Sequence, residues 1–155
     1  MTFLRKIKRL IDWLPVIWND YDWDYHALYV IMRKKLSRME PTIRNGCAIT
    51  SESTADDIHF AVMLLDRLIA CDYLQNALIP HNREWGELGE MILGEEENGL
   101  VEWLGNNWEF ADTEEKRLQA EEEFRIAGKN SDWSEERDKD LLFDYLSKNI
   151  KNWWD

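Results

Sequence analysis

The chain of 155 residues has few cysteines, prolines and glycines, and it has no long hydrophobic run. Its two cysteines, Cys47 and Cys71, form neither a CxxC pair nor a metal-type cluster. They therefore predict reduced thiols rather than a disulfide framework. No segment approaches the ~18 consecutive apolar residues of a membrane span, and the first apolar residues are spaced rather than continuous, unlike a signal peptide. We expect a protein of a reducing cytoplasm with no membrane span.

Motifs of catalytic or metal chemistry are also missing. The glycines are too scattered for a phosphate-binding GxGxxG or GxxxxGK loop, and no Cys/His or Ser/His/Asp order indicates a nucleophile. The acids at positions 20, 22 and 24 resemble the start of an EF-hand loop, but Tyr25 stands where Gly is needed and Ile31 where Glu is needed. The histidines lack the spacing of zinc ligands (His26, His59 and His81). We expect no enzyme, no metal and no other cofactor.

Charge is divided unevenly along the chain. Residues 1–83 hold 11 Lys+Arg against 10 Asp+Glu, a net charge of +1, whereas residues 84–155 hold 8 against 21, a net charge of −13. An acidic half of this kind repels duplex nucleic acid. It either keeps the protein soluble as a solvated face or attracts a basic partner protein. The glutamate triplets 95–97 and 121–123 are open to the same two interpretations, solvated surface or mimicry of a phosphate backbone.

Helical periodicity dominates the sequence, and no alternating strand pattern of useful length is present. We expect one all-α domain over residues 1–155, a compact bundle of five to six helices with short irregular segments. Residues 1–83 would form a near-neutral core and residues 84–155 an acidic layer. In the first half we expect a helix ending at Leu14, a connection over 15–21, and a helix over 23–39 that Asp22 caps and Pro41 ends. A loop over 41–53 follows, and then a helix over 54–76 that Thr54 opens, with Pro80 beyond its end. In the second half we expect brief helices within 83–108, a helix that Thr113 caps and Gly128 stops, and a last helix over 132–152.

The first helix is amphipathic. Its apolar positions follow helical spacing, and its four basic residues lie mostly on the other face (apolar Phe3, Ile7, Leu10, Ile11 and Leu14; basic Arg5, Lys6, Lys8 and Arg9). Such a helix could rest on a membrane surface. We favour the alternative, in which it docks on its own domain or on a sister subunit.

The most informative segment is 18–39, which begins with acids and aromatic residues and ends with a basic group. This order matches the helix dipole. Arginine can grip a phosphate with two hydrogen bonds, lysine supplies a point charge, and aromatic rings stack on bases. The candidate ligand-binding residues are the cations Arg33, Lys34, Lys35, Arg38 and Arg44, the aromatic residues Trp18, Tyr25 and Tyr29, and His26. In the alternative interpretation, these cations only complement a helix end and pair with acids of the same chain.

Residues 22–39, DWDYHALYVIMRKKLSRM, resemble a family of small uncharacterised proteins encoded by tailed bacteriophages. The recurring pattern is an acidic-aromatic WDY, then Leu, then M-x-x-K-L-x-R-M. Here the pattern falls on Trp23, Asp24, Tyr25, Leu28, Met32, Lys35, Leu36, Arg38 and Met39. The resemblance implies a phage gene product that acts in the host bacterial cytoplasm as an accessory protein. It implies no activity.

These observations lead to three hypotheses. The first is a non-catalytic anti-defence protein, a homo-oligomer that binds and sequesters a phosphorylated nucleotide signal of host immunity. The second is an acidic, DNA-mimic-like inhibitor directed at a basic host protein, either a nucleic-acid-binding defence protein or a transcription protein. The third is a component of the virion or of its assembly.

Overall fold

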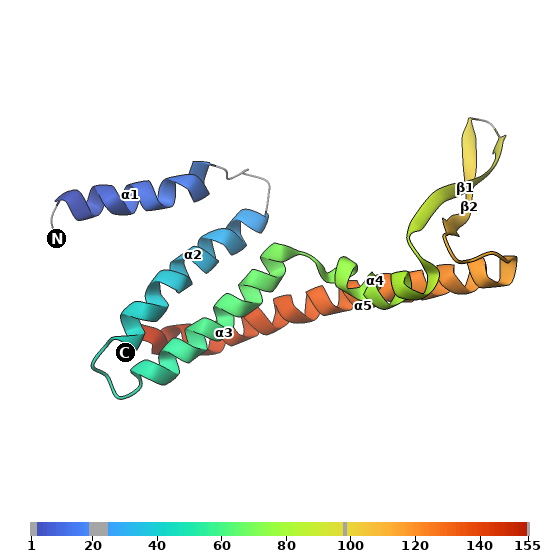
Figure 1. The fold of residues 1–155 in the computed structure, drawn as a ribbon. Coiled ribbons are helices and arrows are strands. Elements are labelled where there is room, and N and C mark those ends of the chain that lie inside the picture. Colours follow the sequence, from blue (N-terminus) through green and yellow to red (C-terminus); the bar gives the residue numbers. More distant parts are fainter. Residues whose placement is uncertain (1–2, 19–24, 98, 155) are drawn as a thin grey trace. The chain divides into compact units, whose positions relative to one another are not determined.

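The computed structural model describes residues 3–18, 25–97 and 99–154. In these ranges the elements are α1 (Phe3–Trp18), α2 (Tyr25–Arg44), α3 (Ser51–Ala70), α4 (Tyr73–Trp85), β1 (Leu88–Glu97), β2 (Leu100–Trp108), α5 (Glu114–Asn149) and the 3-10 helix η1 (Ile150–Trp154), as Figure 1 shows. The prediction of a mostly helical protein is confirmed. The prediction of an all-α protein is wrong, because β1 and β2 form a sheet.

The chain divides into two compact units. Unit 1 comprises residues 1–70 and 138–155, and unit 2 comprises residues 71–137. Helix α5 contributes its beginning to unit 2 and its end to unit 1. Of the described helices, none is both long enough and apolar enough to cross a bilayer.

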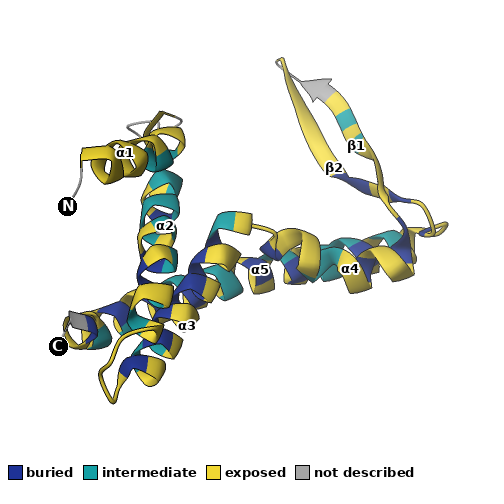
Figure 2. Cartoon of the chain, turned by 60° about the vertical axis from the view of Figure 1, so that its left-hand side comes forward, coloured by how far each residue is buried: buried dark blue, intermediate teal, exposed yellow. Residues whose placement is uncertain are grey.

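The core of unit 1 lies between α2, α3 and the end of α5. Helices α2 and α3 lie side by side and are joined by the loop 45–50 (Figures 1 and 2). The ring of Tyr29 packs against Phe143 with 6.4 Å between the ring centroids, and Phe60 packs edge-on against Tyr145 at 4.9 Å. The buried apolar residues of this core are Tyr29, Leu36, Met39, Ala55, Ile58, Ala61, Val62, Leu64, Leu65, Leu68, Leu142, Leu146 and Trp153.

Two polar contacts fix the end of α5 on α3. Tyr145 Oη donates a hydrogen bond to Asp57 Oδ1 at 2.6 Å. Burial and this bond raise the pKa of the Tyr145 hydroxyl to about 12. Arg67 Nη2 lies 2.7 Å from Asp138 Oδ2, and the Asp138 side chain is only 1% exposed. The apolar faces bring the helices together, and these contacts determine which residues of α5 face α3.

The predicted helix over 54–76 is two helices. Helix α3 begins three residues earlier, at Ser51, so Thr54 lies inside it and donates its backbone N–H to Thr50 O. The break comes at Cys71, which has a φ of 49° and separates α3 from α4. The left-handed conformation is uncommon for a residue other than Gly, Asn or Asp, and no Gly or Pro in the sequence marks the break. Helical periodicity alone therefore could not locate it.

All three prolines lie inside helices, so the predicted helix ends at Pro15 and Pro41 are wrong, and so is the placement of Pro80 beyond a helix. A proline removes its own N–H bond and crowds the preceding turn, but the helix continues where other contacts hold it. At Pro41 the last turn of α2 gains side-chain bonds. Thr42 Oγ1 donates to Arg38 O at 3.1 Å, and Asn45 Nδ2 donates to Pro41 O at 2.7 Å. The loop consequently shrinks from the predicted 41–53 to 45–50.

Unit 2 has a small aromatic core where α4, the hairpin and α5 meet. Its buried residues are Trp85, Trp108, Ala111 and Ala120, with Phe124 packed against them. The His81 ring stacks edge-on against Trp108 at 4.5 Å, and its Nε2 donates to Ala120 O at 2.9 Å. The bonded partner explains why a histidine tolerates burial at this position.

Residues 88–108 form an antiparallel hairpin, not the predicted brief helices. Leu88 pairs with Trp108 and Glu97 with Leu100, and three register shifts interrupt the ladder between these ends. The shifts break the alternation of apolar and polar residues, so a period of two is not visible in the sequence. The dipeptide Asn98-Gly99 is nonetheless a strong hairpin signal, and Gly99 has a φ of 80°. That signal could have predicted the turn.

Helix α5 is one helix of 36 residues, where the sequence predicted two. Thr113 caps it as predicted, since Thr113 Oγ1 accepts the Lys116 N–H at 3.3 Å. Gly128 does not stop it. A glycine inside a helix costs about 1 kcal/mol relative to alanine, and the helix is held on both sides of Gly128 by the buried residues Ala127 and Ser131.

Candidate ligand-binding site

The predicted aromatic residues do not gather at one site. Trp18 ends α1 with 80% of its surface exposed. Tyr25, which is 64% exposed, meets Tyr29 edge-on with 5.8 Å between centroids. Tyr29 itself is buried against Phe143, so its ring has no face to offer to a base. His26 is half-buried on α2. The stacking role predicted for Tyr29 is therefore not compatible with its burial.

Three of the five predicted cations contact carboxylates or a backbone oxygen of unit 1. Arg33 Nε lies 2.8 Å from Asp66 Oδ1. Arg44 Nη2 lies 2.8 Å from Asp56 Oδ1 and 3.3 Å from Glu40 Oε1, and its hydrogen bonds to these carboxylates raise its pKa. Lys34 Nζ donates to the backbone oxygen of Asp12 and stands 5.5 Å from the Trp13 ring centroid.

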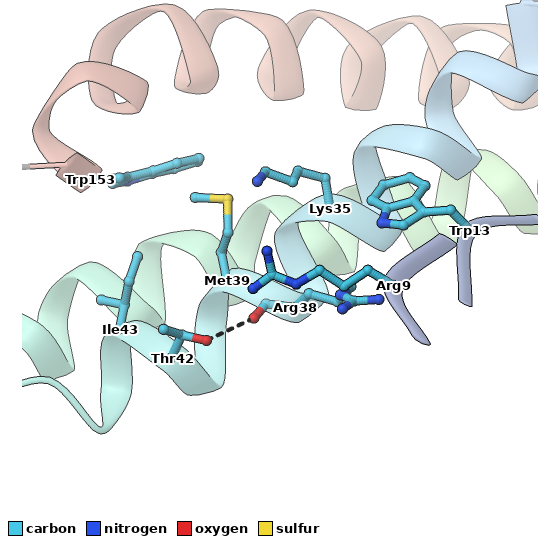
Figure 3. Close-up of a pocket in the computed structure, with 8 residues that line it drawn as sticks. All are labelled: Arg9, Trp13, Lys35, Arg38, Met39, Thr42, Ile43 and Trp153. Atoms are coloured by element: carbon cyan, nitrogen blue, oxygen red, sulfur yellow. Dashed lines mark hydrogen bonds between the residues drawn. The ribbon is translucent and has the colours of Figure 1, made fainter. Parts of the chain in front are cut away.

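The other two cations, Lys35 and Arg38, line a hollow of about 510 Å³ in unit 1. Helix α1 contributes Arg9 and Trp13, α2 contributes Met39, Thr42 and Ile43 beside the two cations, and η1 contributes Trp153 (Figure 3). Figure 3 shows the Lys35 side chain extending toward Trp153. The volume falls within the roughly 300–1,000 Å³ that small-molecule sites occupy.

The lining of this hollow is positively charged. It contains three cations, and of the described residues that line it, none is a carboxylate. Arg38 Nη1 lies 3.2 Å from Asp12 Oδ2. Both partners of that pair are well exposed, at 38% and 40% of their side-chain surface. A surface ion pair of this kind contributes at most about 1 kcal/mol, so a ligand with a stronger negative charge could replace Asp12.

The indole of Trp153, which lines the hollow, carries an unsatisfied donor. Trp153 is 4% exposed, and its Nε1 has no hydrogen-bond partner within the described part of the chain. Leaving a buried N–H unpaired costs about 1–3 kcal/mol. The indole lines the hollow, but its Nε1 is enclosed by protein atoms, so a ligand acceptor would reach this N–H only after the ring turned.

Sequence reasoning missed Arg9, Trp13 and Trp153. Arg9 and Trp13 lie four residues apart on one face of α1, away from its apolar stripe, and this spacing is a local signal that could have paired them. Trp153 is more than a hundred residues from Lys35, and it joins the hollow only because α5 and η1 return to α2. No local pattern carries that information.

The glutamates at 121–123 are largely structural. Glu121 accepts hydrogen bonds from the backbone N–H and the side-chain amide of Asn106. Glu123 accepts one from Trp85 Nε1 at 2.7 Å and one from Gln119, and these bonds lower the Glu123 pKa. Glu122 pairs with Arg125. Two members of the triplet therefore hold unit 2 together rather than forming an open acidic face.

Charge also separates by unit. Unit 1 holds 13 Lys+Arg and 13 Asp+Glu, a net charge of zero, and unit 2 holds 6 against 18, a net charge of −12.

In the described ranges no cluster of three or more His, Cys, Asp or Glu residues could bind a metal. Both cysteines are exposed thiols.

The residues of this chain carry the functional argument alone. Comparison of the chain with models of protein families, with curated proteins and with solved structures finds no match.

Proposed function

We propose that this protein binds a small phosphorylated nucleotide in the hollow between α1, α2 and η1, and that it sequesters this ligand without chemical change. The observation that carries the proposal is the gathering of three cations, together with Trp13 and Trp153, around one volume of about 510 Å³. Arg9, Lys35 and Arg38 would hold the phosphate, and Trp13, which is less buried than Trp153, would contact the base. Trp13 thus takes the role first predicted for Trp18, Tyr25 and Tyr29.

The charges favour a phosphate over a carboxylate. Arginine matches the geometry of phosphate with two parallel hydrogen bonds, and lysine adds a mobile point charge. A terminal phosphate, or the two phosphates of a dinucleotide taken together, carries about two negative charges, against the single charge of the Asp12 carboxylate that Arg38 now contacts. Stacking of a base on an aromatic side chain contributes about 1–3 kcal/mol. Together these groups supply both parts of nucleotide recognition.

The biological setting follows from the resemblance of residues 22–39 to phage proteins. A phage accessory protein that captures a nucleotide signal of host immunity needs affinity and copy number only. Its place of action would be the host bacterial cytoplasm. The hollow is formed within one chain, so a single copy offers the whole site. The predicted homo-oligomer stays a prediction.

Isothermal titration calorimetry tests the proposal. The full chain is titrated with cyclic dinucleotides, ADP-ribose, mononucleotides and inorganic phosphate, and we expect one class to bind with micromolar or better affinity. Lys35→Glu should weaken this binding at least tenfold. Lys8→Glu makes the same charge change at an exposed position that does not line the hollow, and it should leave the affinity unchanged.

Two further results complete the test. Trp153→Phe keeps the ring and removes the N–H, so it should weaken the binding of any ligand that accepts that hydrogen bond. Bound ligand recovered by mass spectrometry should be unaltered, because the proposal is sequestration. The absence of heat with every compound, or equal loss of affinity in Lys8→Glu, contradicts the proposal.

A second function is favoured by the concentration of negative charge in unit 2, whose net charge is −12. In this alternative, unit 2 covers a basic site on a host nucleic-acid-binding protein. Glu114 and Glu115 are exposed in the first turn of α5, so Glu114→Gln with Glu115→Gln removes charge without touching the bonds of Glu121 and Glu123. Capture of one nucleic-acid-binding protein from host lysate, lost in this double variant but kept in Lys35→Glu, would favour the inhibitor.

A further inference from the structure

Helix α1 leaves its apolar face uncovered. Of its described residues none is buried, and Figure 2 shows the helix exposed along most of its length. Eight large apolar side chains lie on it with 38% to 80% of their surface exposed: Phe3, Leu4, Ile7, Leu10, Ile11, Leu14, Ile17 and Trp18. A helix of a globular protein normally buries such residues, so this face needs a partner.

The eight side chains form one continuous face. With 3.6 residues per turn, successive residues are rotated by about 100°, and the eight positions fall within an arc of roughly 140°. Lys6 lies at one edge of this arc and Lys8 at the other. The helix carries four basic residues and one acidic residue, Asp12. It therefore has a broad apolar face with a positive charge along each border.

The rest of unit 1 contacts the opposite side of α1. Lys34 donates to the backbone oxygen of Asp12, Arg38 pairs with the Asp12 carboxylate, and Arg9 and Trp13 line the hollow beside α2. These residues lie on the side of the helix opposite the centre of the apolar arc. The predicted docking of the apolar face on the protein's own domain is thus not what the described residues show.

We propose that α1 is an in-plane anchor that lays this apolar face on an anionic lipid bilayer. Helices that bind bilayer surfaces combine a wide apolar face, a basic polar face and aromatic residues. Phe3 and Trp18 lie at the two ends of the face, and an indole is suited to the boundary between headgroups and acyl chains. The stems of Lys6 and Lys8 extend along the apolar edge, and their ammonium groups reach the phosphate level.

Charge argues against a second α1 helix as the occupant. Two such helices packed face to face would bring four lysines along the same seam, with no carboxylate on the apolar arc of either copy to neutralise them. Like charges at a helix interface are destabilising. Anionic lipid headgroups supply the missing negative charge. The proposal is independent of nucleotide binding, because the hollow and the apolar arc lie on opposite sides of α1.

Co-sedimentation of the full chain with sucrose-loaded vesicles tests the proposal. Vesicles of phosphatidylglycerol and phosphatidylcholine in equal amounts should pellet the protein, and vesicles of phosphatidylcholine alone should bind it at least tenfold less. Leu10→Glu should lower binding to the anionic vesicles at least tenfold, because it places a charge within the arc. Leu118→Glu is the matched control, since Leu118 in unit 2 is 67% exposed and Leu10 is 66% exposed.

A charge variant separates electrostatic attraction from apolar burial. Lys6→Glu with Lys8→Glu leaves every apolar residue in place, and it should lower binding to anionic vesicles several-fold and weaken its dependence on salt. Light scattering after size exclusion examines the competing occupant. The proposal would be overturned if the wild-type chain did not bind vesicles and formed a dimer that Leu10→Glu converts to a monomer. A second copy of the chain would then be the partner of the apolar face. Equal loss of binding in Leu10→Glu and Leu118→Glu would overturn it as well.

Discussion

Replacement of Tyr145 by phenylalanine should destabilise unit 1 by about 2 kcal/mol at pH 7. The Tyr145 hydroxyl donates a bond of 2.6 Å to the Asp57 carboxylate, and this bond joins α5 to α3. Hydrogen bonds to charged groups contribute about 1.5–3 kcal/mol. The lower half of that range applies here, because Asp57 is only half-buried and water can reach it once the hydroxyl is gone.

The same contact makes a prediction about pH. The Tyr145 pKa is raised to about 12 from its ordinary value of 10, chiefly by burial and then by the bond to Asp57. The folded protein therefore keeps the proton that the unfolded chain loses. The resulting stability is fully present below pH 10 and is lost as the pH rises through 12. Two pKa units correspond to about 2.7 kcal/mol, of which about half is lost by pH 11.

Urea unfolding followed by far-ultraviolet circular dichroism measures both effects. The free energies of unfolding of the wild type and Tyr145→Phe should differ by about 2 kcal/mol at pH 7 and by about 1 kcal/mol or less at pH 11, since only the wild type titrates at this position. Tyr25→Phe is the control, because Tyr25 is 64% exposed and its change should be within about 0.3 kcal/mol. A difference below about 0.5 kcal/mol at pH 7, or one that stays constant to pH 11, would refute the reasoning.

Other substitutions test the remaining contacts of both units. Arg67→Met leaves the Asp138 carboxylate, 1% exposed, without its arginine and should lower the free energy of unfolding by about 3 kcal/mol. Adding Asp138→Leu should restore part of that loss. If the effects of the two substitutions simply add, the pairing is contradicted. Gly86→Ala should cost about 3 kcal/mol, because Gly86 has a φ of 78° and a Cβ there would lie 2.5 Å from Glu109 Cβ. Gly128 lies inside α5, and a Cβ there would have nothing within 4 Å. Gly128→Ala should therefore raise the free energy of unfolding by about 0.5–1 kcal/mol. Urea midpoints that move in the same direction for both glycines would contradict the assigned backbone conformations.

Residues close together in the chain specify the local features of this protein. The mostly helical character, the buried face of α3, the cap at Thr113 and the loop around Asn45-Gly46 each follow from residues within one or two turns of each other. The amphipathic pattern of α1 is likewise local. Periodicity reports how a segment divides polar from apolar residues, and that division is a property of the segment alone.

Long-range packing fixes which faces meet and where the helices and strands end. Pro15, Pro41 and Gly128 were predicted to end helices, but the local cost of such a residue inside a helix is only about 1–3 kcal/mol, and contacts on both sides outweigh it. Hydrophobic periodicity did not predict the hairpin, because its register shifts interrupt the alternation of apolar and polar residues along the strands. The hollow is lined by residues of α1, α2 and η1, which are distant in the sequence. Its cations could therefore be predicted only in part: Lys35 and Arg38 were predicted, and Arg9 was missed. Sites assembled from distant segments depend on packing, and packing is the part of the fold that no single stretch of sequence specifies.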